Sequence, residues 1–145
     1  MNNRHAPPRQ LLTFEQNLRL ERRILTAEIA QANGRPCLPN PNAWDDNVAK
    51  PIANKLCQSC PVAAAKACLR IAVIDEAILH ANSGRNLYMI VWGTRGGMNP
   101  RARRPLVTEL ADQIITDRID HAERARAEAE RKRAEAVAAK AGAAA

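Results

Sequence analysis

Residues 53–62 read ANKLCQSCPV and place a Cys-x-x-Cys pair in a chain that has only two other cysteines. Cys37 precedes the pair and Cys68 follows it, so all four cysteines fall between residues 37 and 68. Four thiolates complete the coordination of a tetrahedral zinc ion or of a four-iron cluster, and the spacing of Cys57 and Cys60 lets two sulfurs converge on one centre. The sequence therefore predicts one metal centre held by Cys37, Cys57, Cys60 and Cys68.

Helix-forming patterns lie on both sides of the pair. Residues 12–32 are predicted to form a helix, with Thr13 as N-cap and Gln16 as its capping-box partner. Residues 62–81 are rich in Ala, Leu and Ile, and Pro61 suits a first helical turn. We therefore expect an all-α fold, a small helical bundle around a cysteine-ligated centre.

The spacing of the last two cysteines sets a condition on the second helix. A helix rises about 1.5 Å per residue, so a regular helix from Pro61 would hold Cys60 and Cys68 about 12 Å apart along its axis. We therefore expect residues 61–64 to bend, or the regular helix to start later.

The remainder of the chain divides into segments of different character. Residues 87–92 are apolar and β-prone, which predicts a short turn or β segment near Trp92. Residues 108–139 consist of strong helix formers and predict a long C-terminal helix or a disordered tail. We expect a disordered N-terminus at 1–10, a cluster-binding domain at 11–105 and a basic, Ala-rich extension at 106–145.

The net charge of +7 is unevenly distributed. Residues 95–104 contain four arginines and no acidic residue, within a loop rich in Gly and Pro. Such a segment can neutralise DNA phosphates or enter a minor groove, although a solvated basic loop has the same composition. The predicted DNA contacts are Arg95, Arg101, Arg103 and Arg104.

Two sequence features bear on the compartment. Residues 1–10 are polar and Pro-rich, unlike a secretory signal, and the apolar stretch 87–92 is too short to span a bilayer. We therefore expect a cytoplasmic protein without a membrane partner. Thiols stay reduced there, so a cysteine quartet binds metal more readily than it forms disulfides.

Three motifs together resemble a known family. Residues 53–62 are followed by Cys68 and an aliphatic helix, Trp44-Asp45 lies between Cys37 and the pair, and Val91-Trp92-Gly93 precedes the arginine-rich stretch. Over about residues 37–105 this arrangement resembles the WhiB-like iron-sulfur transcription regulators of actinobacteria and their phages. The chain departs from the family in having seven rather than five residues between Cys60 and Cys68. It also has Ile90 and Thr94 where the family's Gly-Val/Ile-Trp-Gly-Gly turn has glycine.

The resemblance implies a function and a set of contacts. The family binds a 4Fe-4S cluster, reacts with oxygen or nitric oxide, and docks on the C-terminal region of the principal sigma factor to adjust transcription. By the same resemblance, Trp92 and Gly93 in the turn, together with Trp44, would contact the sigma factor. Core packing is the alternative role for the two tryptophans.

Two other functions fit the cysteines. One is a zinc-stapled interaction module without redox function, because the cysteine count alone does not distinguish zinc from iron. The other is a thiol-disulfide oxidoreductase acting through Cys57 and Cys60, but the βαβ context and a neighbouring positive charge are missing from the sequence. The three histidines are scattered and suggest no catalytic assembly, so we expect a non-enzymatic protein.

Overall fold

The computed structural model describes residues 12–37 and 55–143, and their fold is all-α. The helices are α1 (Phe14–Gln31), α3 (Val62–Ser83), α4 (Leu87–Ile90) and α5 (Pro100–Ala143), and residues 55–58 form a further helical turn. The predicted fold class and the long C-terminal helix are thus confirmed. The expected disordered N-terminus at 1–10 and the predicted site residue Trp44 lie outside the described residues.

Helix α1 begins where the sequence places its capping box. The Thr13 hydroxyl accepts a hydrogen bond from the Gln16 amide at 3.2 Å, and the Gln16 side chain accepts one from the Thr13 amide at 2.8 Å. Two of the amides that a helix start leaves without partners are thereby satisfied. Leu18 is the buried residue of this helix and lies in the main hydrophobic core.

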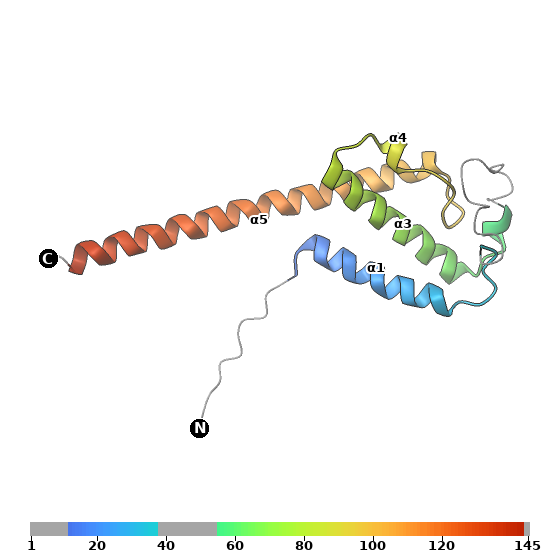
Figure 1. The fold of residues 1–145 in the computed structure, drawn as a ribbon, viewed down its shortest axis with the longest axis horizontal. Helices are drawn as coiled ribbons and strands as arrows, with labels where there is room; N and C mark the ends of the chain where they lie inside the picture. The colour runs from blue at the N-terminus through green and yellow to red at the C-terminus, as the bar shows by residue number, and fades with distance from the viewer. Residues whose placement is uncertain (1–11, 38–54, 144–145) are drawn as a thin grey trace, which may run out of the picture.

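Helix α3 is the centre of the bundle, with α1 along one side and the first part of α5 along the other (Figure 1). Its small side chains, such as Ala77, let the neighbouring helices approach closely, and Ile74 is completely buried between them. The helix ends at Gly84, whose left-handed backbone (φ 59°) suits glycine.

The segment before Trp92 is helical, so the prediction of a β segment there is wrong. In α4 the Asn86 side chain accepts a hydrogen bond from the Tyr88 amide at 2.9 Å and caps the helix. Ile90 and Val91 are buried against α3 and α5. A short apolar run carries too little periodicity to separate helix from strand, which explains the error. The turn follows Trp92 instead, where Arg95 and Met98 form an isolated antiparallel bridge.

Helix α5 starts at Pro100 rather than at Thr108. The Asn99 side chain accepts a hydrogen bond from the Ala102 amide at 2.9 Å, and proline needs no partner in the first turn. The buried residues of α5 include Val107, Leu110 and Ile114 in the main core. The predicted domain boundary between residues 105 and 106 is therefore misplaced, because the packed part of the chain continues to about Arg118.

Beyond Arg118, α5 leaves the bundle. Every residue from 119 to 143 is exposed, and Figure 1 shows this part of the helix projecting away from α1 and α3. This part of the helix carries local ion pairs, such as those of Arg131 with Glu128 and Glu135. Within the described residues, no helix combines the length and the apolar character needed to cross a membrane.

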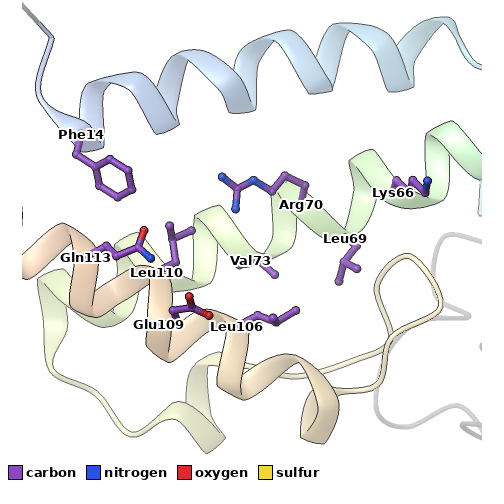
Figure 2. A pocket seen from close by; sticks show the side chains of 9 residues that line it. All are labelled: Phe14, Lys66, Leu69, Arg70, Val73, Leu106, Glu109, Leu110 and Gln113. Carbon is purple, nitrogen blue, oxygen red and sulfur yellow. The ribbon is translucent and has the colours of Figure 1, made fainter.

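A groove of about 400 Å³ lies where α1, α3 and α5 meet (Figure 2). Its apolar lining includes Phe14, Val73 and Leu110, and its charged lining includes Arg70 and Glu109. None of the residues singled out in the sequence for a site lies in this groove. The four cysteines line a separate cavity, which meets α3 at Ala64, Ala65 and Cys68.

Candidate metal centre

All four cysteines line one cavity of about 230 Å³. Cys37 comes from the segment after α1, Cys57 from the helical turn at 55–58, and Cys68 from α3. Cys60 lies just before α3, in a turn where its amide donates to the Cys57 carbonyl at 3.1 Å. The structure thus brings together the four side chains that the sequence assigns to one centre, and all four are free thiols.

The expected bend at residues 61–64 is not observed. Helix α3 begins at Val62, and the Ala65 amide donates to the Pro61 carbonyl at 2.9 Å. Cys60 reaches the cavity because it precedes the helix and belongs to the turn that starts at Leu56. Ala64 and Cys68, one helical turn apart, form the α3 side of the cavity.

The turn after Trp92 covers one side of the cavity through Gly96. The Gly96 backbone packs directly on α3, and a Cβ atom there would overlap the Ala65 carbonyl oxygen and lie 2.8 Å from the Leu69 Cβ. Its left-handed φ of 54° also favours glycine. This close approach lets the Gly96 amide donate a hydrogen bond to the Cys68 sulfur.

The sulfurs influence one another electrostatically. Burial raises the pKa of Cys60, and repulsion from the sulfurs of Cys37, Cys57 and Cys68 raises it further. Burial also raises the pKa of Cys68, against the opposing effects of the Gly96 amide and the Arg95 guanidinium. Burial thus favours the protonated form of both thiols, and ligation of a metal would release these protons.

The four cysteines form one set of thiol donors around the cavity. In the part of the chain that the structure describes, no group of three or more His, Cys, Asp or Glu side chains is arranged to hold one metal ion. Zinc bonds to sulfur at about 2.3 Å, so tetrahedral ligation would require the sulfurs to lie within about 4 Å of one another. A four-iron cluster is bulkier and is held by more widely spaced thiolates. Four thiols around one cavity are the donor set of either kind of centre, a zinc ion or a four-iron cluster.

Two of the predicted sigma-contact residues, Trp92 and Gly93, lie at the start of the turn that covers the cavity, and the third, Trp44, is outside the described residues. Trp92 is 45% exposed, and the neighbouring Tyr88 and Met89 are 70% and 74% exposed. Gly93 is buried, so it offers no exposed surface to a partner. We call Tyr88, Met89 and Trp92 the aromatic patch. Core packing is thus not the role of Trp92.

Three of the four predicted DNA-contact arginines reach the surface to different extents. Arg101 is exposed. The Arg104 guanidinium lies 3.9 Å from the centre of the Tyr88 ring, and the Arg95 guanidinium lies 5.0 Å from the centre of the Trp92 ring. Arg95 also lines the cysteine cavity, as does Arg35. Sequence reasoning did not single out Arg35, although the residue lies only two positions before the predicted ligand Cys37.

Arg103 is completely buried, so its assignment to DNA binding is withdrawn. Its guanidinium forms a two-point ion pair with Glu76 at 2.7 and 2.8 Å. It also donates to three backbone carbonyls of the turn, those of Trp92, Gly93 and Met98. Arg103 therefore ties the turn to α3 and α5, and phosphate groups cannot reach it.

The comparisons with known proteins give no relative on which to base a function. No protein-family model, no curated protein and no solved structure matches the chain.

Proposed function

We propose that this chain is a WhiB-like transcription regulator that holds a 4Fe-4S cluster on Cys37, Cys57, Cys60 and Cys68. The observation that carries the proposal is that these four side chains, from three separate parts of the chain, line one cavity. Ligation by all four would fix the segment after α1, the turn at 55–60 and α3 to one another. Loss of the cluster would therefore loosen this end of the bundle and the surface beside it.

The surroundings of the cavity suit a negatively charged thiolate centre. The Gly96 amide donates to the Cys68 sulfur, and the guanidinium groups of Arg35 and Arg95 line the cavity. When bound, the cluster would supply a centre that reacts with oxygen or nitric oxide, as in the family that the chain resembles. The role of this chain's own residues is to hold the thiolates and to stabilise their charge.

The aromatic patch is our proposed contact with the C-terminal region of the principal sigma factor. Its three members are exposed and lie within residues 88–92, and a tryptophan in a short turn offers a large contact area with little side-chain entropy to lose. Its position directly before the cavity-covering turn would place partner binding under the influence of the centre. Arg104 stacks on Tyr88 of the patch, and Arg101 and Arg104 would contact promoter DNA.

The cluster itself is tested by anaerobic purification followed by an absorption spectrum and assays for iron, sulfide and zinc. We expect brown protein with about four irons and about four sulfides per chain. Colourless protein with about one zinc would overturn the cluster in favour of a structural zinc module. Metal-free protein that reduces insulin disulfides would favour an oxidoreductase, a role that the raised pKa of Cys60 makes unfavourable.

The sigma contact is tested with Trp92→Ala, in a binding assay with the C-terminal region of an actinobacterial principal sigma factor. Truncation of a central tryptophan should weaken binding by about 30-fold or more, which corresponds to about 2 kcal/mol. Ile24→Ala is the matched control, because Ile24 is 52% exposed but lies on α1. Equal affinities for the two variants would remove Trp92 from the proposed interface.

DNA binding is tested with Arg101→Ala, using Arg85→Ala as a control because Arg85 is exposed and lies outside the arginine-rich stretch. If Arg101 neutralises a phosphate, its loss lowers affinity for all sequences and reduces the salt dependence by about one counterion. Unchanged affinity and salt dependence would exclude Arg101 from a DNA contact.

A further inference from the structure

Arg95 lies between the cysteine cavity and the aromatic patch. Its side chain lines the cavity together with Cys68, and its guanidinium carbon is 5.0 Å from the centre of the Trp92 ring. One of its terminal nitrogens donates to the Thr94 carbonyl at 3.0 Å. A single side chain is thus in reach of both the proposed centre and the proposed docking residue.

The backbone around Arg95 is firmly held. The Arg95 amide donates to the Met98 carbonyl at 3.1 Å, and the Met98 amide donates back at 2.9 Å. Arg103 binds the carbonyls on both sides of the turn, and Gly96 is packed on α3. A change in the cavity would therefore act on the Arg95 side chain more readily than on its backbone.

Two carboxylates and the cysteine sulfurs set the electric field at the Arg95 guanidinium. Asp75 and Glu76 line a hollow next to the cavity together with Arg95. Asp75 is paired with Arg22 at 2.7 Å, and Glu76 is paired with the buried Arg103. Four thiolates around an iron-sulfur core carry a net negative charge, whereas protonated thiols carry none. Filling the cavity would therefore change the field at the Arg95 guanidinium considerably, while the two carboxylates keep their own partners.

We propose that Arg95 is a positioning residue that couples the charge in the cysteine cavity to the placement of the Trp92 side chain. With an anionic centre bound, attraction to the sulfurs restrains the guanidinium in its place between the cavity and Trp92, and the cation–π contact then holds the Trp92 ring. With neutral thiols this attraction disappears, and Trp92 is held less firmly. This inference rests on the proposed function and specifies how its docking surface would be regulated.

The first test is the reduction potential of the reconstituted protein. Arg95→Gln removes a positive charge next to the centre, so its potential should be more negative than that of the wild type. Arg95→Lys keeps the charge and should stay close to the wild type, and Arg85→Gln is the control for an exposed arginine away from the cavity. A purely structural role of Arg95 would not make the potential follow the charge.

The second test measures how accessible Trp92 is to acrylamide in a Trp44→Phe background, where Trp92 is the remaining tryptophan. The Stern–Volmer constant is divided by the fluorescence lifetime to give the bimolecular quenching constant. In protein with Arg95 intact, the quenching constant should be at least twofold larger after iron and sulfide are removed with a chelator. In Arg95→Gln the two forms should give the same constant, and Arg95→Lys should restore the difference.

Reciprocity supplies a test that keeps Arg95 in place. If cavity charge and Trp92 placement are coupled, Trp92→Leu must also shift the reduction potential. Tyr88→Leu is the matched control, because it removes the stacking on Arg104, which does not line the cavity. A shift in Trp92→Leu alone supports the coupling, and equal potentials in the two variants overturn it.

The outcomes separate the two proposals. If the wild type binds the cluster but Arg95→Gln keeps both the wild-type potential and the wild-type change in Trp92 quenching, the coupling is wrong and the cluster proposal stands. If the wild type binds no iron-sulfur cluster on reconstitution, the proposed function fails and the coupling fails with it.

Discussion

At the scale of single residues, Arg103 holds the end of the bundle together. Its guanidinium is fully buried, paired with Glu76, and bonded to three carbonyls of the turn that covers the cavity. A buried ion pair adds little stability compared with an apolar replacement of both partners, but loss of one partner leaves the other buried and unpaired.

Arg103→Met should therefore destabilise the protein by about 3–5 kcal/mol, as measured by urea unfolding of the apoprotein. The double variant with Glu76→Leu should recover part of this loss, because no unpaired carboxylate remains. A loss of less than about 1 kcal/mol in the single variant would contradict the role assigned to Arg103.

Gly96 gives a second prediction at this scale, with Gly97 as its control. Both glycines have positive φ, so alanine costs about 1–2 kcal/mol of backbone strain at either position. Only at Gly96 does a Cβ also collide with α3; at Gly97 it would lie 3.7 Å from the Cys57 Cβ, an ordinary contact. Gly96→Ala should thus cost about 1–3 kcal/mol more than Gly97→Ala in urea unfolding. Equal losses would show that the turn does not need to pack this closely.

The residue scale also shows what the sequence could and could not predict. Cysteine spacing was sufficient to predict that Cys37, Cys57, Cys60 and Cys68 line one cavity. Charge composition was not sufficient to assign Arg103, because an arginine in a basic run reads as exposed unless its partner is known. That partner, Glu76, is 27 residues away, and the pairing depends on how α3 and α5 pack.

At the scale of elements, local chemistry determined the helices that have clear ends. The capping box of α1 was predicted from the sequence, and it is the start that the structure shows. The sequence did not predict that α4 is a helix, because its four residues are too few to show a helical periodicity and its packing depends on the burial of Ile90. The start of α5 was missed because the Gly- and Pro-rich composition of residues 95–104 reads as a loop, whereas Pro100 is the first residue of the helix.

Ion pairs attach α1 to its neighbours and make the packing sensitive to acid. Glu15 binds Arg118 of α5 at 2.6 Å, and this hydrogen bond, together with that from Arg19, lowers the pKa of Glu15. The contribution of a carboxylate with a lowered pKa is fully present above its unfolded pKa, about 4.5, and is lost as pH falls through the folded value.

Stability should therefore fall as pH is lowered below about 4.5, and Glu15→Gln should flatten part of this fall in thermal unfolding. Glu128→Gln is the control, because the pKa of Glu128 is also lowered but its partners lie on the projecting part of α5. If the two variants show the same pH dependence, the Glu15–Arg118 pair does not attach α1 to the bundle.

At the scale of the whole molecule, the chain consists of a packed bundle and a projecting helix. The bundle ends where Arg118 pairs with Glu15 and donates to the Asn82 side chain. Residues 119–143 are exposed throughout, so their helix is stabilised by local propensity and ion pairs of a few tenths of a kcal/mol each.

Truncation after residue 120 should therefore leave the unfolding temperature of the bundle unchanged within about 2 °C. It should also remove the part of the circular dichroism signal that melts gradually, because an isolated helix lacks the cooperativity of a packed core. A marked loss of bundle stability would show that the projecting helix folds back on the rest of the chain.

The central claim for the whole molecule is that one iron-sulfur centre uses all four cysteines. The most direct test is the iron and sulfide content of anaerobically reconstituted wild type, of each single Cys→Ser variant, and of Ser59→Ala, which alters a residue inside the Cys-x-x-Cys pair. We predict about four irons and four sulfides in the wild type and in Ser59→Ala, and at most half of that in every cysteine variant. A wild type without iron and sulfide, or any cysteine variant with the full content of both, would contradict the claim.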